Sequence, residues 1–101
     1  MKVNFNRTFK DFKGNDLVIN GHPQYMADII AQCLFNGDGA KPTGDFAKDG
    51  NRKMRAYKLC MRIIQTEGDL SIEAEDAVLI KESVVSLTPG CYSQIVELID
   101  G

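Results

Sequence analysis

The sequence predicts an α+β fold in which an N-terminal β-hairpin packs on a mostly helical body of four helices. Residues 2–9 alternate between apolar and polar side chains, which is typical of a half-buried strand. From residue 25 onward, apolar residues recur at spacings of three and four, which indicates helices that each bury one face. The chain has 101 residues, the length of one ordinary domain, so we expect a single domain over 1–101.

The predicted hairpin covers residues 2–20. Its first strand would turn Val3, Phe5 and Phe9 toward the body. A turn is expected at the run KGND, because Gly and Asn readily adopt positive φ, and the run LVI that follows would be the return strand. A lone hairpin is only marginally stable in water, so its apolar side must rest on the helices.

The helical body is predicted over residues 22–100. A first helix would begin at Pro23, since proline is favoured at the first helical position, and would end before Gly37. A second helix is predicted over 52–66, where apolar side chains again recur at helical spacing.

Two further helices complete the predicted body. Ser71 is the expected N-cap of the third helix, and Thr88 caps the fourth, with Pro89 at its first position. The core-facing residues expected in the four helices are Tyr25, Met26, Ile29, Ile30, Cys33, Leu34, Ala56, Leu59, Cys60, Ile63, Ile64, Ala77, Ile80, Val84, Leu87, Tyr92, Ile95, Val96 and Ile99.

The segment 36–51 is predicted to be a long flexible loop. It holds four glycines and one proline, and loops of this length in a small domain tend to be functional or disordered. Phe46 is its only large apolar residue. Phe46 either anchors the loop to the body or is exposed for contact with a partner.

The titratable residues do not form a catalytic or metal-binding motif. Cys33, Cys60 and Cys91 are odd in number, far apart and set among apolar neighbours, so we expect three reduced cysteines in the core. The single histidine, His22, has no nucleophile near it in sequence. We therefore expect no enzymatic activity, no cofactor and no metal.

The charges are strongly segregated along the chain. Residues 52–62 hold five basic residues and no acid, whereas residues 67–82 hold six acids and one lysine. These two patches either face each other and pair, or one of them attracts a partner of opposite charge. The candidate partner-binding residues are Glu73, Glu75, Asp76, Arg55, Lys58, Arg62 and Phe46.

The overall composition excludes two classes of partner. No run of about 18 apolar residues is present, and no secretory signal follows the N-terminus, so we expect no membrane association. The net charge of −2 argues against direct nucleic-acid binding, which depends on cationic contacts to phosphate. The free cysteines indicate a reducing cytoplasm.

Several segments resemble a family of small proteins encoded by phages and prophages. They are KVNFNRTFKDFKGNDL at the start, then KMRAYKLCMRII, LSIEAEDAVLIKESVVSL and YSQIVELID, whereas the loop 36–51 is particular to this chain. The resemblance implies a phage gene product that acts in the cytoplasm of a bacterial host. It carries over no functional residues.

Three functions compete in that setting. The favoured one is a non-enzymatic protein-binding module that inhibits a host protein, such as a CRISPR–Cas defence protein, through a charged surface. The alternative is an accessory or chaperone of virion or tail assembly. Both functions are compatible with a homo-oligomer. A small DNA-binding regulator is disfavoured, because Glu73, Glu75 and Asp76 would place acids where a recognition helix meets phosphate.

Overall fold

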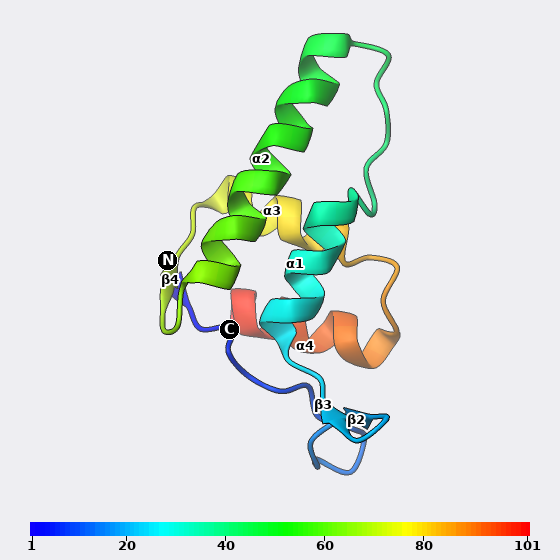
Figure 1. Cartoon of the computed structure of the whole chain (residues 1–101), viewed down its shortest axis with the longest axis vertical. Coiled ribbons are helices and arrows are strands. Elements are labelled where there is room, and N and C mark those ends of the chain that lie inside the picture. Colours follow the sequence, from blue (N-terminus) through cyan, green and yellow to red (C-terminus); the bar gives the residue numbers. More distant parts are fainter.

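The computed structural model describes all 101 residues. In chain order, its elements are β1 (Lys2–Val3), β2 (Val18–Ile19), β3 (His22–Pro23), α1 (Met26–Asn36), α2 (Phe46–Gln65), β4 (Leu70–Ser71), α3 (Ala74–Ser83) and α4 (Pro89–Asp100). The predicted α+β class is confirmed, since four helices form the body and two short antiparallel strand pairs complete it (Figure 1). None of the helices combines the length and the apolar character needed to cross a membrane.

The molecule is elongated, with extents of 44 × 24 × 24 Å. The cause is α2, whose N-terminal half extends beyond the other helices (Figure 1). The C-terminal half of α2 packs with α1, α1 also contacts α3, and α3 contacts α4. The segment 38–45 runs back along the extended half of α2 and connects it to α1.

The N-terminal hairpin is present, and its paired strands are β2 and β3, which run antiparallel. Its turn is Asn20–Gly21, where both residues have positive φ, 52° and 79°, as a two-residue hairpin turn requires. The run KGND forms a second turn, closed by a bridge between Lys10 and Asp16. The predicted turn is therefore confirmed, but the hairpin extends past residue 20 to β3.

The first extended segment has different neighbours from those predicted. β1 pairs with β4, so that Lys2 lies opposite Ser71, and not with residues 17–19. The carbonyl of Phe5 accepts the N–H of Ala27, which fastens this segment to the start of α1. Alternation of side chains correctly predicted the buried side, with Val3, Phe5 and Phe9 all buried. It could not predict the partner strand, β4, which lies more than 60 residues further along the chain.

α1 begins three residues later than predicted. His22 and Pro23 are the return strand of the tight turn, so Pro23 is in β3 and not at the first helical position, and the N-cap is Tyr25. The predicted end is confirmed, because Gly37 is the C-cap with φ 73° and donates its N–H to the carbonyls of Cys33 and Leu34.

α2 begins at Phe46 and not at residue 52, so the predicted loop 36–51 is wrong over its last six residues. Asp45 is the N-cap, and its carboxylate accepts the N–H groups of Ala47 at 3.0 Å and Lys48 at 3.2 Å. Asp49 accepts the Thr43 hydroxyl at 2.8 Å and thereby fixes the chain that leads into the helix. These local contacts outweigh the unfavourable helix propensity of Gly50.

α3 and α4 begin with different kinds of cap. Ser71 belongs to β4, so its predicted role as the cap of α3 is wrong; the N-cap is Glu73, in a reciprocal capping box with Asp76. In α4 the prediction is confirmed, since the Thr88 hydroxyl accepts the Cys91 N–H and Pro89 is the first helical residue.

One apolar core joins the helices and the N-terminal segment. Its most buried large residues come from every helix, which confirms most of the predicted core-facing positions; they are Phe9, Ile30, Leu34, Leu59, Ile72, Ile80, Val84 and Ile95. Tyr25 and Ile64 are wrong, because their exposed fractions are 44 % and 52 %.

Candidate functional site

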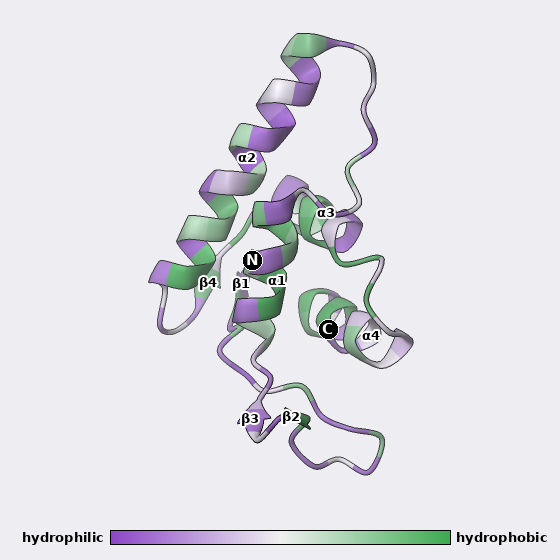
Figure 2. Cartoon of the chain, turned by 45° about the vertical axis from the view of Figure 1, so that its right-hand side comes forward, coloured by the Kyte–Doolittle hydropathy of each residue, from purple (hydrophilic) through white to green (hydrophobic).

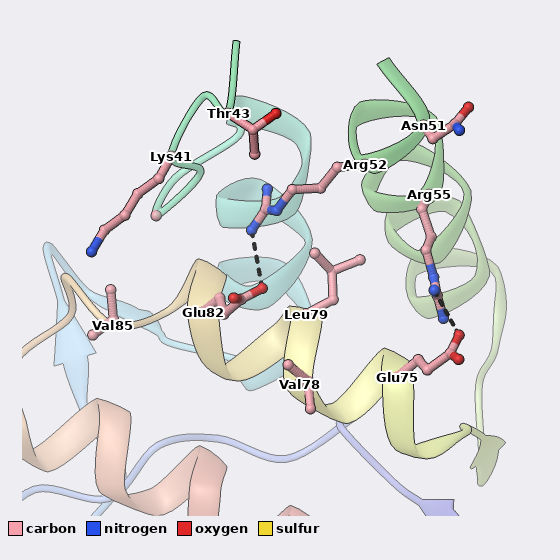
Figure 3. A pocket seen from close by; sticks show the side chains of 11 residues that line it. Lys41, Thr43, Asn51, Arg52, Arg55, Glu75, Val78, Leu79, Glu82 and Val85 are labelled. Carbon is pink, nitrogen blue, oxygen red and sulfur yellow. Dashed lines mark ion pairs between the residues drawn. The ribbon is translucent and has the colours of Figure 1, made fainter. Parts of the chain in front are cut away.

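The basic patch of α2 and the acidic patch of α3 face each other. Arg55 lies 2.7 Å from the carboxylate of Glu75 and 3.5 Å from that of Asp76. Arg62 lies 3.4 Å from Asp76. Arg52 lies 3.5 Å from Glu82, and Figure 3 shows this pair together with that of Arg55 and Glu75. Of the two interpretations of the charge segregation, mutual pairing is therefore the one that the structure shows for these residues.

Asp76 is the centre of this charged seam. It is 6 % exposed, and its carboxylate accepts the Glu73 N–H at 3.0 Å while contacting Arg55 and Arg62. Burial by itself would raise the pKa of Asp76, but the Glu73 N–H and the two guanidinium groups outweigh it and hold the pKa below its usual value. Asp76 thus holds α3 against α2 and is not available at the surface.

Beside the seam, the extended half of α2, the segment 38–45 and α3 enclose an open groove of about 760 Å³. Figure 3 shows Arg52 and Arg55 reaching across it from α2 toward the acids of α3. The lining combines three cations, two carboxylates and a few apolar and small polar residues: Gly39, Lys41, Thr43, Asn51, Arg52, Arg55, Glu75, Val78, Leu79, Glu82 and Val85.

Arg52 has unused hydrogen-bonding capacity in this groove. Its Nη2 atom is shielded from solvent and has no hydrogen-bond partner, because the Glu82 carboxylate at 3.5 Å is too poorly placed to accept. The Arg52 side chain is 26 % exposed and lines the groove, where an acidic ligand would form a charge-assisted contact with the guanidinium. Lys41, on the facing segment, has no carboxylate within ion-pair distance.

The α3 wall of the groove carries two exposed valines beside its acids. Val78, in α3, and Val85, just after it, are 56 % and 61 % exposed and line the groove two helical turns apart. Two exposed valines beside the unpaired Lys41 and the cationic Arg52 are suited to a ligand that carries both apolar and acidic side chains.

Gly39 holds the segment 38–45 against α3. Its φ is 73°, and a Cβ at this position would stand only 2.0 Å from the carbonyl oxygen of Glu82. Only glycine allows the two backbones to approach so closely. This close approach brings the segment 38–45 against the end of α3 at one side of the groove.

The other candidate residues lie outside the groove. Phe46 is 95 % exposed at the first turn of α2, so its interpretation as a loop anchor is wrong. Lys58 is exposed on α2 and has no carboxylate partner. Glu73 caps α3, and Arg62 is committed to Asp76 and to the Ser71 carbonyl. Of the predicted partner-binding set, the groove gathers only Arg55 and Glu75.

Sequence reasoning missed the residues that give the groove its character. The candidate partner-binding residues did not include Lys41, Arg52, Val78 or Val85, although Arg52 belongs to the basic patch 52–62. The signal for the valines was their position beside the buried stripe of α3, where exposed residues are usually polar.

The cysteines are free thiols, two buried and one half-buried. Burial, aided by the carboxylate of Asp38, raises the pKa of Cys33 to about 11. Burial also raises the pKa of Cys60. Thiols shifted in this direction are poor nucleophiles at neutral pH. No group of three or more histidine, cysteine or acidic side chains is placed to hold a metal ion.

Comparison with known proteins identifies no matching family, no similar curated protein and no similar solved structure.

Proposed function

We propose that this protein is a non-enzymatic protein-binding module that holds a segment of another protein in the groove between α2, the segment 38–45 and α3. The observation that carries the proposal is the open groove itself, in which Lys41 has no carboxylate partner and Arg52 has only the Glu82 carboxylate, 3.5 Å from its Nη2 atom. The bound segment would place a carboxylate at Arg52 and apolar side chains against Val78 and Val85.

The resemblance to phage-encoded proteins supplies the setting of this proposal. The partner is then a host protein in the bacterial cytoplasm. By binding the acidic segment of that host protein, this protein would inhibit it and so act as an anti-defence protein. A groove of this size accepts a short helix or an extended peptide, which is a common way for a small domain to engage a larger protein.

Selection from a random peptide library on the immobilised protein tests the groove directly. We expect enriched peptides to carry an acidic residue within one helical turn of apolar residues. Arg52→Ala should weaken their binding about tenfold to a hundredfold, since a hydrogen bond to a charged group contributes about 1.5–3 kcal/mol.

Lys58→Ala is the matched control, because Lys58 is a basic residue of the same helix that lies outside the groove. Its affinity for the selected peptides should equal that of the wild type. Peptides without acidic residues, or an equal loss in both variants, would contradict the proposal. Fluorescence anisotropy with labelled peptide measures both affinities.

A further inference from the structure

The α3 wall of the groove has the spacing of one helix face. Its lining residues are Glu75, Val78, Leu79, Glu82 and, just past the end of the helix, Val85. Residues that recur at intervals of three and four lie on the same side of a helix. The two exposed valines are seven positions apart, which corresponds to about 10 Å along a helix. They form a straight row that a ligand can follow.

The α2 wall is polar. The lining residues that it contributes are Asn51, Arg52 and Arg55. Figure 2 shows the extended half of α2 as mostly hydrophilic, so the apolar side chains of a ligand find their contacts on α3. A ligand in the groove thus meets valines on one side and guanidinium groups on the other. Its apolar and acidic side chains must therefore lie on adjacent sides of the ligand.

The third wall, the segment 38–45, offers almost no backbone for pairing with an extended ligand. The N–H of Ala40 is bonded within the preceding turn, and that of Thr43 is bonded to a carboxylate of α2 at 3.0 Å. Pro42 has no N–H, so Lys41 alone among these four neighbours keeps a free backbone donor. A peptide strand that is added to an edge needs donors and acceptors at alternate residues. This wall does not provide them.

The charges of the lining leave room for one acid. Three cations and two carboxylates give an excess of one positive charge. Arg55 is paired with Glu75 at 2.7 Å, whereas Lys41 has no partner and Arg52 lies 3.5 Å from Glu82. Glu82 lies between the two valines in the sequence of the α3 wall, and Arg52 reaches toward it from across the groove (Figure 3). A single ligand carboxylate is therefore expected between two apolar side chains.

We propose that the bound segment is an amphipathic α-helix, with two apolar side chains on Val78 and Val85 and one acidic side chain at Arg52. The proposal rests on the proposed function, since it names the class of segment that the groove holds. A helix satisfies its own backbone hydrogen bonds and does not need the donors that the segment 38–45 lacks. Helical residues at i and i+7 match the spacing of the valines, and an acid at i+3 or i+4 lies between them on the same side.

The peptides enriched from the random library are the probe for this conformation. We expect them to carry apolar residues at i and i+7 and an acid at i+3 or i+4. On an extended chain, residues i and i+7 point to opposite sides, so a strand would select a different pattern. Free peptides of about 15 residues are mostly unfolded in water. The difference circular-dichroism spectrum on mixing with the protein should therefore show a gain of helix.

A proline substitution in the selected peptide separates the two conformations by affinity. Proline at a central position that points away from the groove should weaken binding about a hundredfold, because it breaks a helix. Alanine at the same position is the control and should leave the affinity unchanged. An extended peptide would tolerate both substitutions, since proline is compatible with an extended backbone. Fluorescence anisotropy measures each affinity.

The variants Arg52→Ala and Lys58→Ala show which of the two proposals fails. Binding that is lost in Arg52→Ala and kept in Lys58→Ala places the peptide in the groove. If such a peptide gains no helix and tolerates proline, the helical ligand is wrong while the proposed function stands. If no peptide is enriched, or binding is indifferent to Arg52→Ala, both proposals are overturned.

Discussion

Gly39→Ala is expected to lower the free energy of unfolding by about 3 kcal/mol, with contributions from a left-handed backbone and from steric overlap. The new Cβ would stand 2.0 Å from the carbonyl oxygen of Glu82 and 2.9 Å from its carbonyl carbon. Backbone atoms cannot move aside as the end of a side chain can, so the segment 38–45 must move away from α3. Equilibrium denaturation in urea, followed by circular dichroism, measures the loss.

Gly37→Ala is the control for this variant. Gly37 has the same φ of 73°, but nothing lies within 4 Å of its Cβ position. In Gly37→Ala, only the left-handed backbone conformation lowers the free energy of unfolding, by about 1 kcal/mol. The difference between the two variants isolates the contact with Glu82. Equal losses would show that the segment 38–45 is not held against α3 and that the groove lacks its outer wall.

Asp76→Ala is expected to lower the free energy of unfolding by about 2 kcal/mol at neutral pH, because it removes a buried acceptor and leaves two arginines short of a partner. Glu75→Ala is the matched control. Glu75 also pairs with Arg55, but its side chain is 71 % exposed, whereas that of Asp76 is 8 % exposed. An exposed pair of this kind contributes at most about 1 kcal/mol.

The effect of Asp76 has a defined pH dependence. Its pKa in the folded protein lies below the usual value of 3.8, so the unfolded chain takes up the proton first as the pH falls. The stabilisation is complete above pH 3.8 and is lost as the pH falls through the lowered pKa. Urea denaturation of wild type and Asp76→Ala should therefore differ at neutral pH and converge in strong acid. A constant difference would show that the Asp76 carboxylate does not act through its charge.

Local patterns predicted the helices well where one face had to be buried. The stripes around Ile30, Leu59, Ile80 and Ile95 follow from the 3.6-residue period, and each of these residues is buried. The glycine cap at Gly37 and the Thr88–Pro89 start of α4 could be predicted because they depend on neighbouring residues alone.

The wrong predictions concern competition between local signals. A high glycine content favoured a loop over residues 46–51, but the Asp45 cap and the contact between Asp49 and Thr43 favour a helix. At Pro23, proline suits both a strand edge and a helix start, and the Asn20–Gly21 turn decides for the strand. Helix and strand propensities of single residues do not take account of such caps, side-chain contacts and turns.

The groove could not be predicted from the sequence. Its walls come from segments whose approach depends on Gly39 meeting the backbone of Glu82, which leaves no periodic signal. The charge segregation left open whether the patches of α2 and α3 pair or attract a partner, and it could not show that Asp76 would be buried or that the Nη2 atom of Arg52 would lack a hydrogen bond. Which charges remain available to a partner is decided by burial, and burial of polar residues is a tertiary property.

The central claim is that this protein acts by holding a partner segment in the groove. Site-specific photo-crosslinking in bacterial cytosol tests this claim most directly. A photoreactive residue at Val78 lies in the groove, and the same residue at Val18, similarly exposed on β2, is the control. We expect one host protein to be captured in stoichiometric amounts from position 78 and not from position 18, with capture lost in Arg52→Ala. Equal capture from both positions, or capture that survives Arg52→Ala, would contradict the account.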